Sequence, residues 1–225
     1  MTKRGPFPTP GCRGSYYYPS SLVFRVAVDA VKRCEVTASD PTEWLRSNDP
    51  YVAIVFSAAS YEALLNDVIH LASEIGGDHW PLLALHGQYL LEQRASVRQK
   101  ADLISLVLTG SRCNWGVLPY QDWSLLEGLR NAMLHARPEG YVLIGKDGRI
   151  DRRVDPDVVK GLRTRGVLAE ENVTGWHVLL QTYGVARWAA TTAADMVKMV
   201  HSLAPEALGP VVAQLANPFI EYLNS

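Results

Sequence analysis

Cysteine is scarce in this sequence, with three residues among 225, at Cys12, Cys34 and Cys113. They are odd in number and no two form a C-x-x-C pair, which argues against a disulfide framework and a zinc ribbon. This use of cysteine is typical of a reducing compartment, so we expect a cytoplasmic protein.

Long apolar runs and an excess of charge are also lacking. The longest apolar stretch, YVAIVFSAASYEALL, is shorter than a membrane span and is interrupted by Ser60, Tyr61 and Glu62. The chain starts with proline and glycine rather than with the apolar core of a signal peptide, so we expect no membrane segment. The 22 basic and 23 acidic side chains leave a net charge of −1. A protein that coats nucleic acid by charge alone is basic, so any nucleic-acid contact here is local.

The motifs G-x-G-x-x-G, H-E-x-x-H and G-x-S-x-G do not occur in the chain. The segment GYVLIGKD approaches the phosphate-loop pattern, but Asp147 stands where that loop needs a serine or threonine to bind magnesium. His70, His79 and His86 lack the spacing of metal ligands. We therefore expect neither a metal ion nor a cofactor.

Apolar periodicity, caps and breakers predict a mainly α protein, an antiparallel helical bundle with a small β-hairpin insertion. Residues 1–19 hold four prolines and three glycines and predict an extended arm, which leaves 20–225 as a single helical domain. The segment YVLIGKDGRI, residues 141–150, predicts the hairpin. The first expected helix starts at Pro19, the second runs from Asp49 to Ile75, and the third covers about 82–109 with a break. Further helices are expected from Asp122 to Ala136 and from Asp155 to about Arg165, and two more start at Thr174 and after Pro205.

The helix expected over 122–136 separates polar from apolar residues. At 100° per residue, its core face holds Leu125, Leu126, Leu129, Ala132, Met133 and Ala136. Glu127, Asn131 and His135 follow one another at intervals of four and form a polar ridge, with Arg130 at its edge. Any amphipathic helix has a polar face. Trp123, Gly128 and Leu134 lie beside this ridge, however, which predicts a surface that meets another subunit.

The segment LRNAMLHARPE resembles the signature helix of the HEPN superfamily, in which an arginine is followed by a polar residue and, after four to six intervening positions, by a histidine. Arg130, Asn131 and His135 match that pattern. The upstream segment FSAASYEALLNDVIH is similar to an earlier helix of the family, whose acidic or amide residue projects toward the same site, and Glu62 and Asn66 would be those positions. The resemblance covers about residues 49–138, and residues 139–225 form a C-terminal helical extension outside it.

The resemblance implies a metal-independent endoribonuclease, a toxin or an antiviral-defence effector, that leaves 2′,3′-cyclic phosphate and 5′-hydroxyl ends. His135 would move protons, Arg130 would bind the phosphate, and Asn131 would orient the ring, with Glu62, Asn66 and Glu127 in supporting roles. The resemblance also implies a homodimer through helix 122–136, with an effector or antitoxin protein as a further partner. Two alternatives stay open: a silent HEPN module that binds a partner protein or a nucleotide, and a helical scaffold without a site.

Two further expectations concern charged side chains. Glu62 either lies on a narrow exposed face or pairs with Arg130. The stretch 149–165 is locally basic and is either a solvated surface or the region that binds RNA phosphates. Its basic residues are Arg149, Arg152, Arg153, Lys160, Arg163 and Arg165.

Overall fold

A computed structural model describes residues 18–38, 47–75, 80–134, 143–144, 150–151, 156–168, 180, 182–203 and 209–224. In this part of the chain the structure is mainly helical. The helices are α1 (Pro19–Thr37), α2 (Asp49–Ile75), α3 (Pro81–Glu92), α4 (Val97–Thr109), α5 (Tyr120–Leu134), α6 (Pro156–Thr164), α8 (Tyr183–Leu203) and α9 (Gly209–Leu223). The expected arm, apart from Tyr18 and Pro19, lies outside the described residues.

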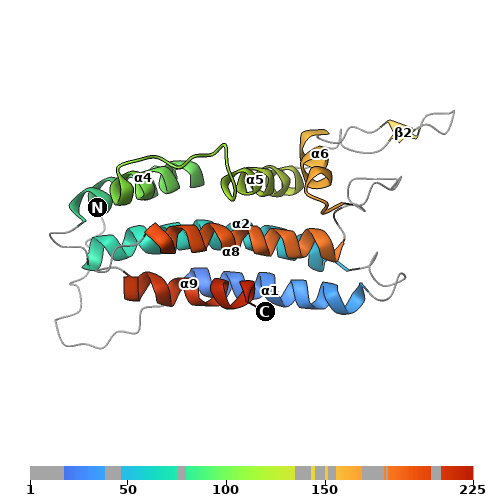
Figure 1. Cartoon of the computed structure of the whole chain (residues 1–225), viewed down its shortest axis with the longest axis horizontal. Coiled ribbons are helices and arrows are strands. Elements are labelled where there is room, and N and C mark those ends of the chain that lie inside the picture. Colours follow the sequence, from blue (N-terminus) through green and yellow to red (C-terminus); the bar gives the residue numbers. More distant parts are fainter. Residues whose placement is uncertain are drawn as a thin grey trace, which may run out of the picture.

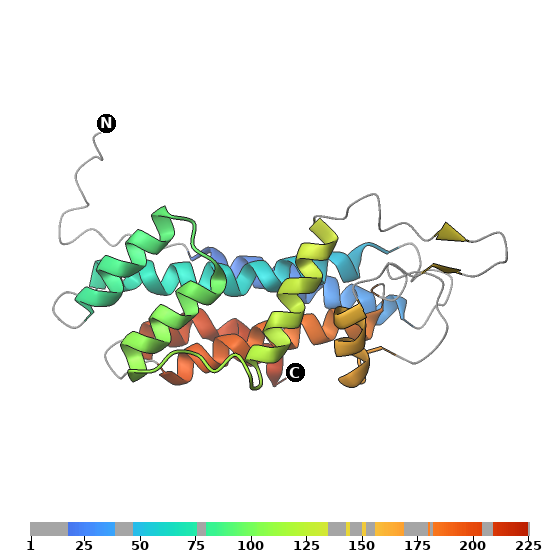
Figure 2. The same ribbon diagram turned by 90° about the horizontal axis from the view of Figure 1, so that it is seen from above.

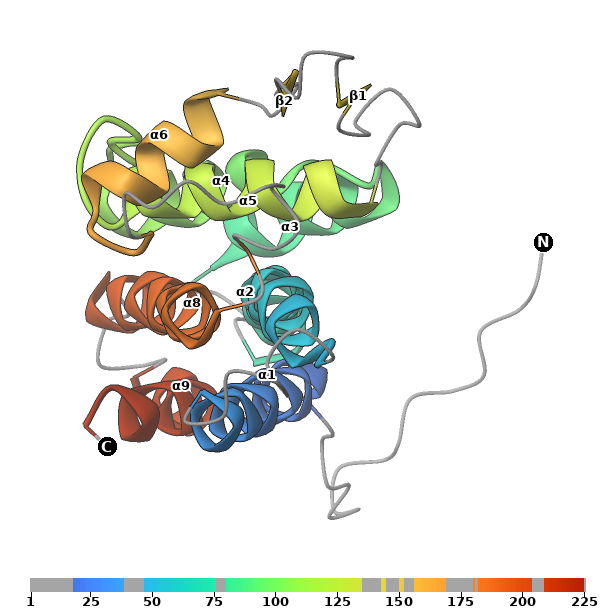
Figure 3. The same ribbon diagram turned by 90° about the vertical axis from the view of Figure 1, so that its right-hand side faces the viewer.

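The helices lie in three layers (Figure 1). α1 and α9 form one outer layer, α2 and α8 form the middle layer, and α3, α4 and α5 cover the other side of α2 and α8, as the end-on view shows (Figure 3). α1 and α2 are antiparallel, as are α8 and α9, but α2 and α8 run in the same direction (Figure 2). The chain from α3 to α6 is therefore a long crossover that connects two parallel helices, and it carries the candidate site.

Two short strands belong to this crossover. β1 (Leu143–Ile144) and β2 (Ile150–Asp151) pair in antiparallel register, Leu143 with Asp151 and Ile144 with Ile150. Residues 145–149 between them lie outside the described residues.

The core lies between the layers. The ring of Phe24 on α1 stacks on that of Phe219 on α9, with 4.0 Å between the centroids. The face of α8 toward its neighbours is rich in fully buried alanines, such as Ala186, Ala189 and Ala193, which allow close helix approach. Glycine has the same effect on α3, because a β-carbon at Gly87 would lie 2.5 Å from Cγ2 of Ile69 on α2.

The middle-layer helix α2 is apolar on almost every side because it contacts helices in all three layers. It is the one helix in the described residues that is long and apolar enough to cross a membrane, by length and composition. Of its most apolar window, 61% is buried inside the protein. The buried central helix of a helical bundle passes the same test of length and composition.

Several helix boundaries confirm the sequence predictions. α2 begins at Asp49 and ends at Ile75, directly before the Gly76-Gly77 pair. The stretch 82–109 is broken as expected, since Ser96 and Gln99 form a capping box that starts α4. α4 ends at Gly110, whose φ of 75° is the left-handed conformation that glycine adopts most readily.

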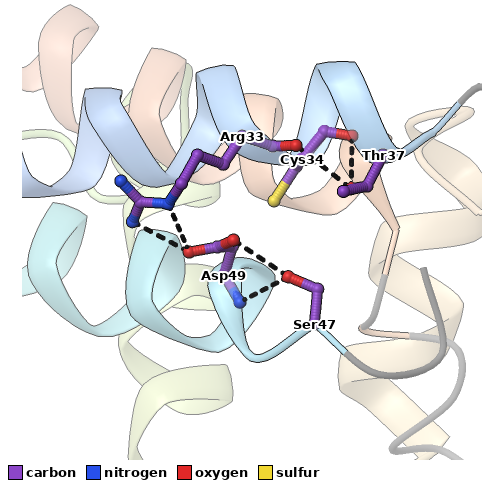
Figure 4. A network of polar contacts seen from close by, with 5 residues as sticks. All are labelled: Arg33, Cys34, Thr37, Ser47 and Asp49. Atoms are coloured by element: carbon purple, nitrogen blue, oxygen red, sulfur yellow. Dashed lines mark hydrogen bonds and ion pairs between the residues drawn. The ribbon is translucent and has the colours of Figure 1, made fainter. Parts of the chain in front are cut away.

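The start of α2 is fixed by a polar network that also joins it to α1 (Figure 4). Ser47 Oγ accepts the Asp49 N–H at 3.1 Å and donates to Asp49 Oδ2 at 2.9 Å. Arg33 on α1 donates through Nε to Asp49 Oδ1 at 2.9 Å. Burial raises the pKa of the neighbouring Cys34 thiol to about 12, so this cysteine stays protonated and packs as an apolar residue.

One helix start differs from the prediction, and the expected start of another falls outside the described residues. α5 begins at Tyr120 rather than Asp122, and the Trp123 N–H donates to the carbonyl of Pro119 at 3.0 Å. Asp122 does not cap the helix start but accepts a hydrogen bond from Arg165 beside α6. α8 begins at Tyr183, where Thr182 Oγ1 accepts the Val185 N–H at 3.3 Å. The expected start at Thr174 lies outside the described residues.

The start of α1 depends on Asp67 of α2, and this contact predicts a pH dependence. Asp67 is buried, and its Oδ2 accepts the Ser20 N–H at 3.2 Å. Burial raises the pKa of Asp67 despite that hydrogen bond. The folded state thus binds the proton more tightly than the unfolded state, and this contribution to stability is lost as pH rises through the folded-state pKa.

We expect Asp67→Asn to unfold with a free energy at least equal to that of the wild type at pH 7, because the amide oxygen still accepts the hydrogen bond without a buried charge. The advantage should disappear below about pH 4, where the aspartate is protonated in both states. Asp67→Ala removes the acceptor and should cost about 1–3 kcal/mol. Urea denaturation at pH 3.5 and pH 7 measures these differences. Equal destabilisation by both substitutions at pH 7 would contradict the assignment.

Candidate functional site

The helix α5 rests on α2 and α8 through a buried stripe formed by Tyr120, Trp123, Leu126 and Leu129. Trp123 is 1% exposed, and its ring meets that of Tyr61 on α2 at 4.6 Å between centroids. The prediction that Trp123 lies on a subunit contact is therefore wrong. Its indole offers a large apolar area, which turns the Trp123 side of α5 toward the core.

Gly128 faces α6 instead of a second subunit, and Leu125 beside it packs on the same helix. A β-carbon at Gly128 would lie 3.8 Å from Cγ2 of Val158, and a β-carbon at Gly161 would lie 2.8 Å from Cδ1 of Leu125. The expected subunit contact at Gly128 is thus an intrachain contact. Of the three residues expected there, Leu134 alone is exposed, at 52%.

Arg130 and Asn131 form a pair near the C-terminal end of α5. Arg130 Nη1 donates to Asn131 Oδ1 at 2.9 Å, and Asn131 is exposed. Arg130 lies on the same side of the helix as Trp123, so it is half-buried, and its Nε is buried and has no acceptor among the described residues. His135 follows the last residue of α5 and lies outside the described residues. The structure therefore brings together two of the three expected catalytic residues.

Glu62 pairs with Lys100 on α4, with 3.2 Å between Nζ and Oε1. Of the two interpretations of Glu62, the pairing with Arg130 is wrong, because the carboxylate is held by this different cation. Lys100 is 5% exposed at its side chain and Glu62 is 38% exposed, so the ammonium is the buried partner. Asn66, one turn further along α2, has a buried Oδ1 that finds no donor in the described part of the chain.

Sequence reasoning missed Lys100, although the sequence contained a signal for it. Val97, Lys100, Ala101 and Ile104 form the buried stripe of α4, and Lys100 occupies a core position in this pattern. A lysine at such a position requires a buried acceptor. Glu62 is the carboxylate that meets it.

We expect Glu62→Gln to destabilise the fold more than Lys100→Met. Removing the carboxylate leaves the Lys100 ammonium buried without a counter-charge, at a cost of about 1–3 kcal/mol, given that water reaches Glu62. Methionine fills the volume of the lysine stem without a charge, so Lys100→Met should change stability by less than about 1 kcal/mol. Urea denaturation of both variants and of the double variant tests this order. An equal loss in both single variants would contradict it.

Glu127 is bound to Arg98 at the start of α4. The Arg98 Nε lies 3.8 Å from Glu127 Oε2, and its Nη2 donates to Ser124 Oγ at 2.7 Å. The same guanidinium lies over the ring of Trp115, 4.8 Å from the centroid. Glu127 and Ser124 thus connect α5 to α4, a second contact that the sequence analysis did not predict.

The loop between α4 and α5 is held by Asp102. Its Oδ1 accepts the Cys113 N–H at 3.2 Å and the Trp115 indole N–H at 2.9 Å. Burial raises the pKa of Cys113 and that of Tyr120, both next to this carboxylate. These groups stay neutral at pH 7, so we assign the cluster to holding the loop that starts α5.

The basic stretch contains residues of different kinds. Lys160 is exposed on α6, whereas Arg163 has a buried Nε without an acceptor in the described residues. Arg165 is paired with Asp122 and also donates to the Gly161 carbonyl at 3.2 Å, which corrects the expectation that it is free to bind RNA. Arg149, Arg152 and Arg153 lie outside the described residues.

A search of the described residues for three or more histidine, cysteine, aspartate or glutamate side chains placed to bind a metal ion finds no such group. Comparison of the chain with protein-family models, with curated proteins and with solved structures finds no match.

Proposed function

We propose that this protein is a metal-independent endoribonuclease of the HEPN type that acts in the cytoplasm as a toxin or an antiviral-defence effector. The observation that carries the proposal is the pair of Arg130 and Asn131 at the end of α5, with Arg130 Nη1 2.9 Å from Asn131 Oδ1. His135 follows Asn131 by four residues in the sequence, the separation of one helical turn. The HEPN-like arrangement of the bundle and a β-hairpin over 141–150, built around β1 and β2, belong to the same proposal.

The chemistry that these residues would support is transesterification of RNA. A base takes the proton of the ribose 2′-hydroxyl as its oxygen attacks phosphorus, and an acid protonates the departing 5′-oxygen. The bond to the 5′-oxygen breaks as the 2′-oxygen bond forms, which leaves a 2′,3′-cyclic phosphate and a 5′-hydroxyl. His135 would serve in one of these proton transfers, and Arg130 would stabilise the charge on the phosphate oxygens.

One histidine cannot act as base and acid in the same step, so the proposal includes a homodimer in which a second copy supplies its own His135. The exposed end of α5, with Asn131 and Leu134, is the part of this helix that the described residues leave uncovered. RNA would reach it alongside Lys160. An effector or antitoxin protein would be a further partner of this surface.

We expect Arg130→Ala to reduce both RNA cleavage and RNA binding, because the substitution removes the cation that would contact the phosphate. Arg130→Lys should restore little activity, since lysine lacks the planar fork that bonds two oxygens and also donates to Asn131. The loss of cleavage should be about 10²–10³-fold. Cleavage of labelled RNA in EDTA, with binding measured by fluorescence anisotropy, tests this. Arg112→Ala, in the loop before α5, is the matched control.

Activity that vanishes in EDTA, or full activity in Arg130→Ala, would refute the mechanism. The alternative function, a silent HEPN module that binds a partner protein or a nucleotide, is favoured by two observations. Arg130 is half-buried with its Nε away from solvent, and Glu62 is bound to Lys100, so neither side chain is fully open to a substrate. That alternative predicts no cleavage in the wild type and loss of stability in Arg130→Ala.

A further inference from the structure

The outer face of α3 carries large apolar side chains that the described part of the chain leaves uncovered. Leu82, Leu85 and Tyr89 are 59%, 70% and 61% exposed. Their spacing of three and four residues places them in one line along the helix, which we call the α3 stripe. The opposite face packs on α2 through Leu83 and Gly87, so the exposure of the α3 stripe does not come from a loosely placed helix.

Neither end of α3 carries the charge that stabilises a helix terminus. The first turn has no acidic residue, the residue before it, Trp80, makes no side-chain cap, and Pro81 has no N–H. The last residue, Glu92, is exposed at the helix C-terminus, where the dipole is negative and favours a cation. A second α3 helix packed antiparallel would place its Glu92 beside the uncapped N-terminus of the first helix, and the first helix would do the same in return. Each glutamate would then lie near a positive helix end.

We propose that the α3 stripe is an interface with a second copy of this chain, in which the two α3 helices pack antiparallel about a twofold axis. Centring the axis between Leu85 and His86 places Leu82 against the partner's Tyr89 and the two Leu85 side chains near each other. The same register places Glu92 just beyond the N-terminal end of the partner's α3, two residues before the position of the partner's Pro81. The interface is self-complementary in both apolar contact and charge.

A twelve-residue helix is about 18 Å long, so this contact is small and belongs to the weak class of interfaces. We expect a dissociation constant in the range of tens of micromolar. The interface differs from the contact at the end of α5 in the proposed function, and neither requires the other. A chain that forms both contacts would assemble into species larger than a dimer, so the experiment must distinguish the two contacts.

The experiment uses Leu134→Glu as its starting point, because that substitution charges the exposed end of α5 and leaves α3 unchanged. Sedimentation velocity between about 5 and 200 µM should show this variant in equilibrium between its 24.9 kDa monomer and a species of twice that mass. Adding Leu85→Glu should weaken association at least about a hundredfold, since two apolar contacts are lost and two carboxylates face each other. Glu92→Lys in place of Leu85→Glu should weaken it about two- to fivefold.

Circular dichroism of each variant establishes that it is folded, and Leu85 is exposed, so its substitution should leave the fold intact. A Leu134→Glu variant that stays monomeric at 200 µM would overturn the proposal. A dimer that persists after Leu85→Glu would overturn it as well. Loss of RNA cleavage in Leu134→Glu with the α3 dimer retained would concern the α5 contact alone, so the two proposals fail separately.

Discussion

His135→Ala is expected to abolish RNA cleavage while RNA binding and folding stay close to those of the wild type. Loss of one general acid–base group costs about 10²–10⁴-fold in rate, which corresponds to about 3–5 kcal/mol of activation barrier. Binding should change little, because the phosphate contact is assigned to Arg130. The assay is cleavage of labelled RNA in EDTA under single-turnover conditions, with binding measured on the same samples.

The matched control is His70→Ala. His70 is exposed on α2 and pairs with Glu74 at 3.2 Å, so its loss removes an imidazole from the surface without touching α5. Full cleavage in the control together with none in His135→Ala would assign the proton transfer to one histidine. Wild-type cleavage in His135→Ala would exclude the proposed mechanism, and the silent module would then be the better reading of the same residues.

Trp123→Ala should produce the largest loss of stability, about 3–5 kcal/mol, because it opens a cavity where α5 rests on Tyr61 of α2. Trp123→Phe keeps an aromatic ring in this position and should cost less than half as much. Leu134→Ala is the control on the exposed part of the same helix, with an expected change within about 0.5 kcal/mol.

Urea denaturation measures the free energy of unfolding of these variants, and light scattering measures their mass. A Trp123→Ala variant that keeps its stability but changes its oligomeric state would contradict the burial of this side chain. It would also restore the sequence prediction that Trp123 belongs to a subunit contact.

Much of the helical pattern was predictable because proline, aspartate and glycine fix helix ends by local chemistry. The Asp49-Pro50 start, the Gly76-Gly77 stop and the left-handed Gly110 are local features of the backbone. The sequence pattern places the start of α5 two residues late, because Asp122 resembles a cap, although Pro119 precedes the helix and its carbonyl accepts the Trp123 N–H. An aspartate near a helix start can cap the helix or pair with a cation. Asp122 pairs with Arg165, which is 43 residues away in the sequence.

The site was less predictable, since a helical wheel gives the faces of a helix but not the neighbour that covers each face. Trp123 lies beside Arg130 on the helical wheel, which predicts that both face outward, whereas the packing of α5 on α2 turns both inward. Glu62 was expected to reach Arg130, but Lys100 is closer, and no local pattern in α2 contains that information. Gly128 was read as a subunit contact because α6, which covers it, is distant in the sequence.

The parallel direction of α2 and α8 also sets the order in which the chain can be completed during translation. α1 and α2 are neighbours in sequence and can pair as soon as both have left the ribosome. By contrast, α5 packs on both α2 and α8, and α8 is synthesised only after α5 and α6. The helix that carries Arg130 and Asn131 can therefore pack on α2 first, and it gains its contact with α8 only once most of the chain exists. A nascent chain that lacks α8 would present α5 without half of its support.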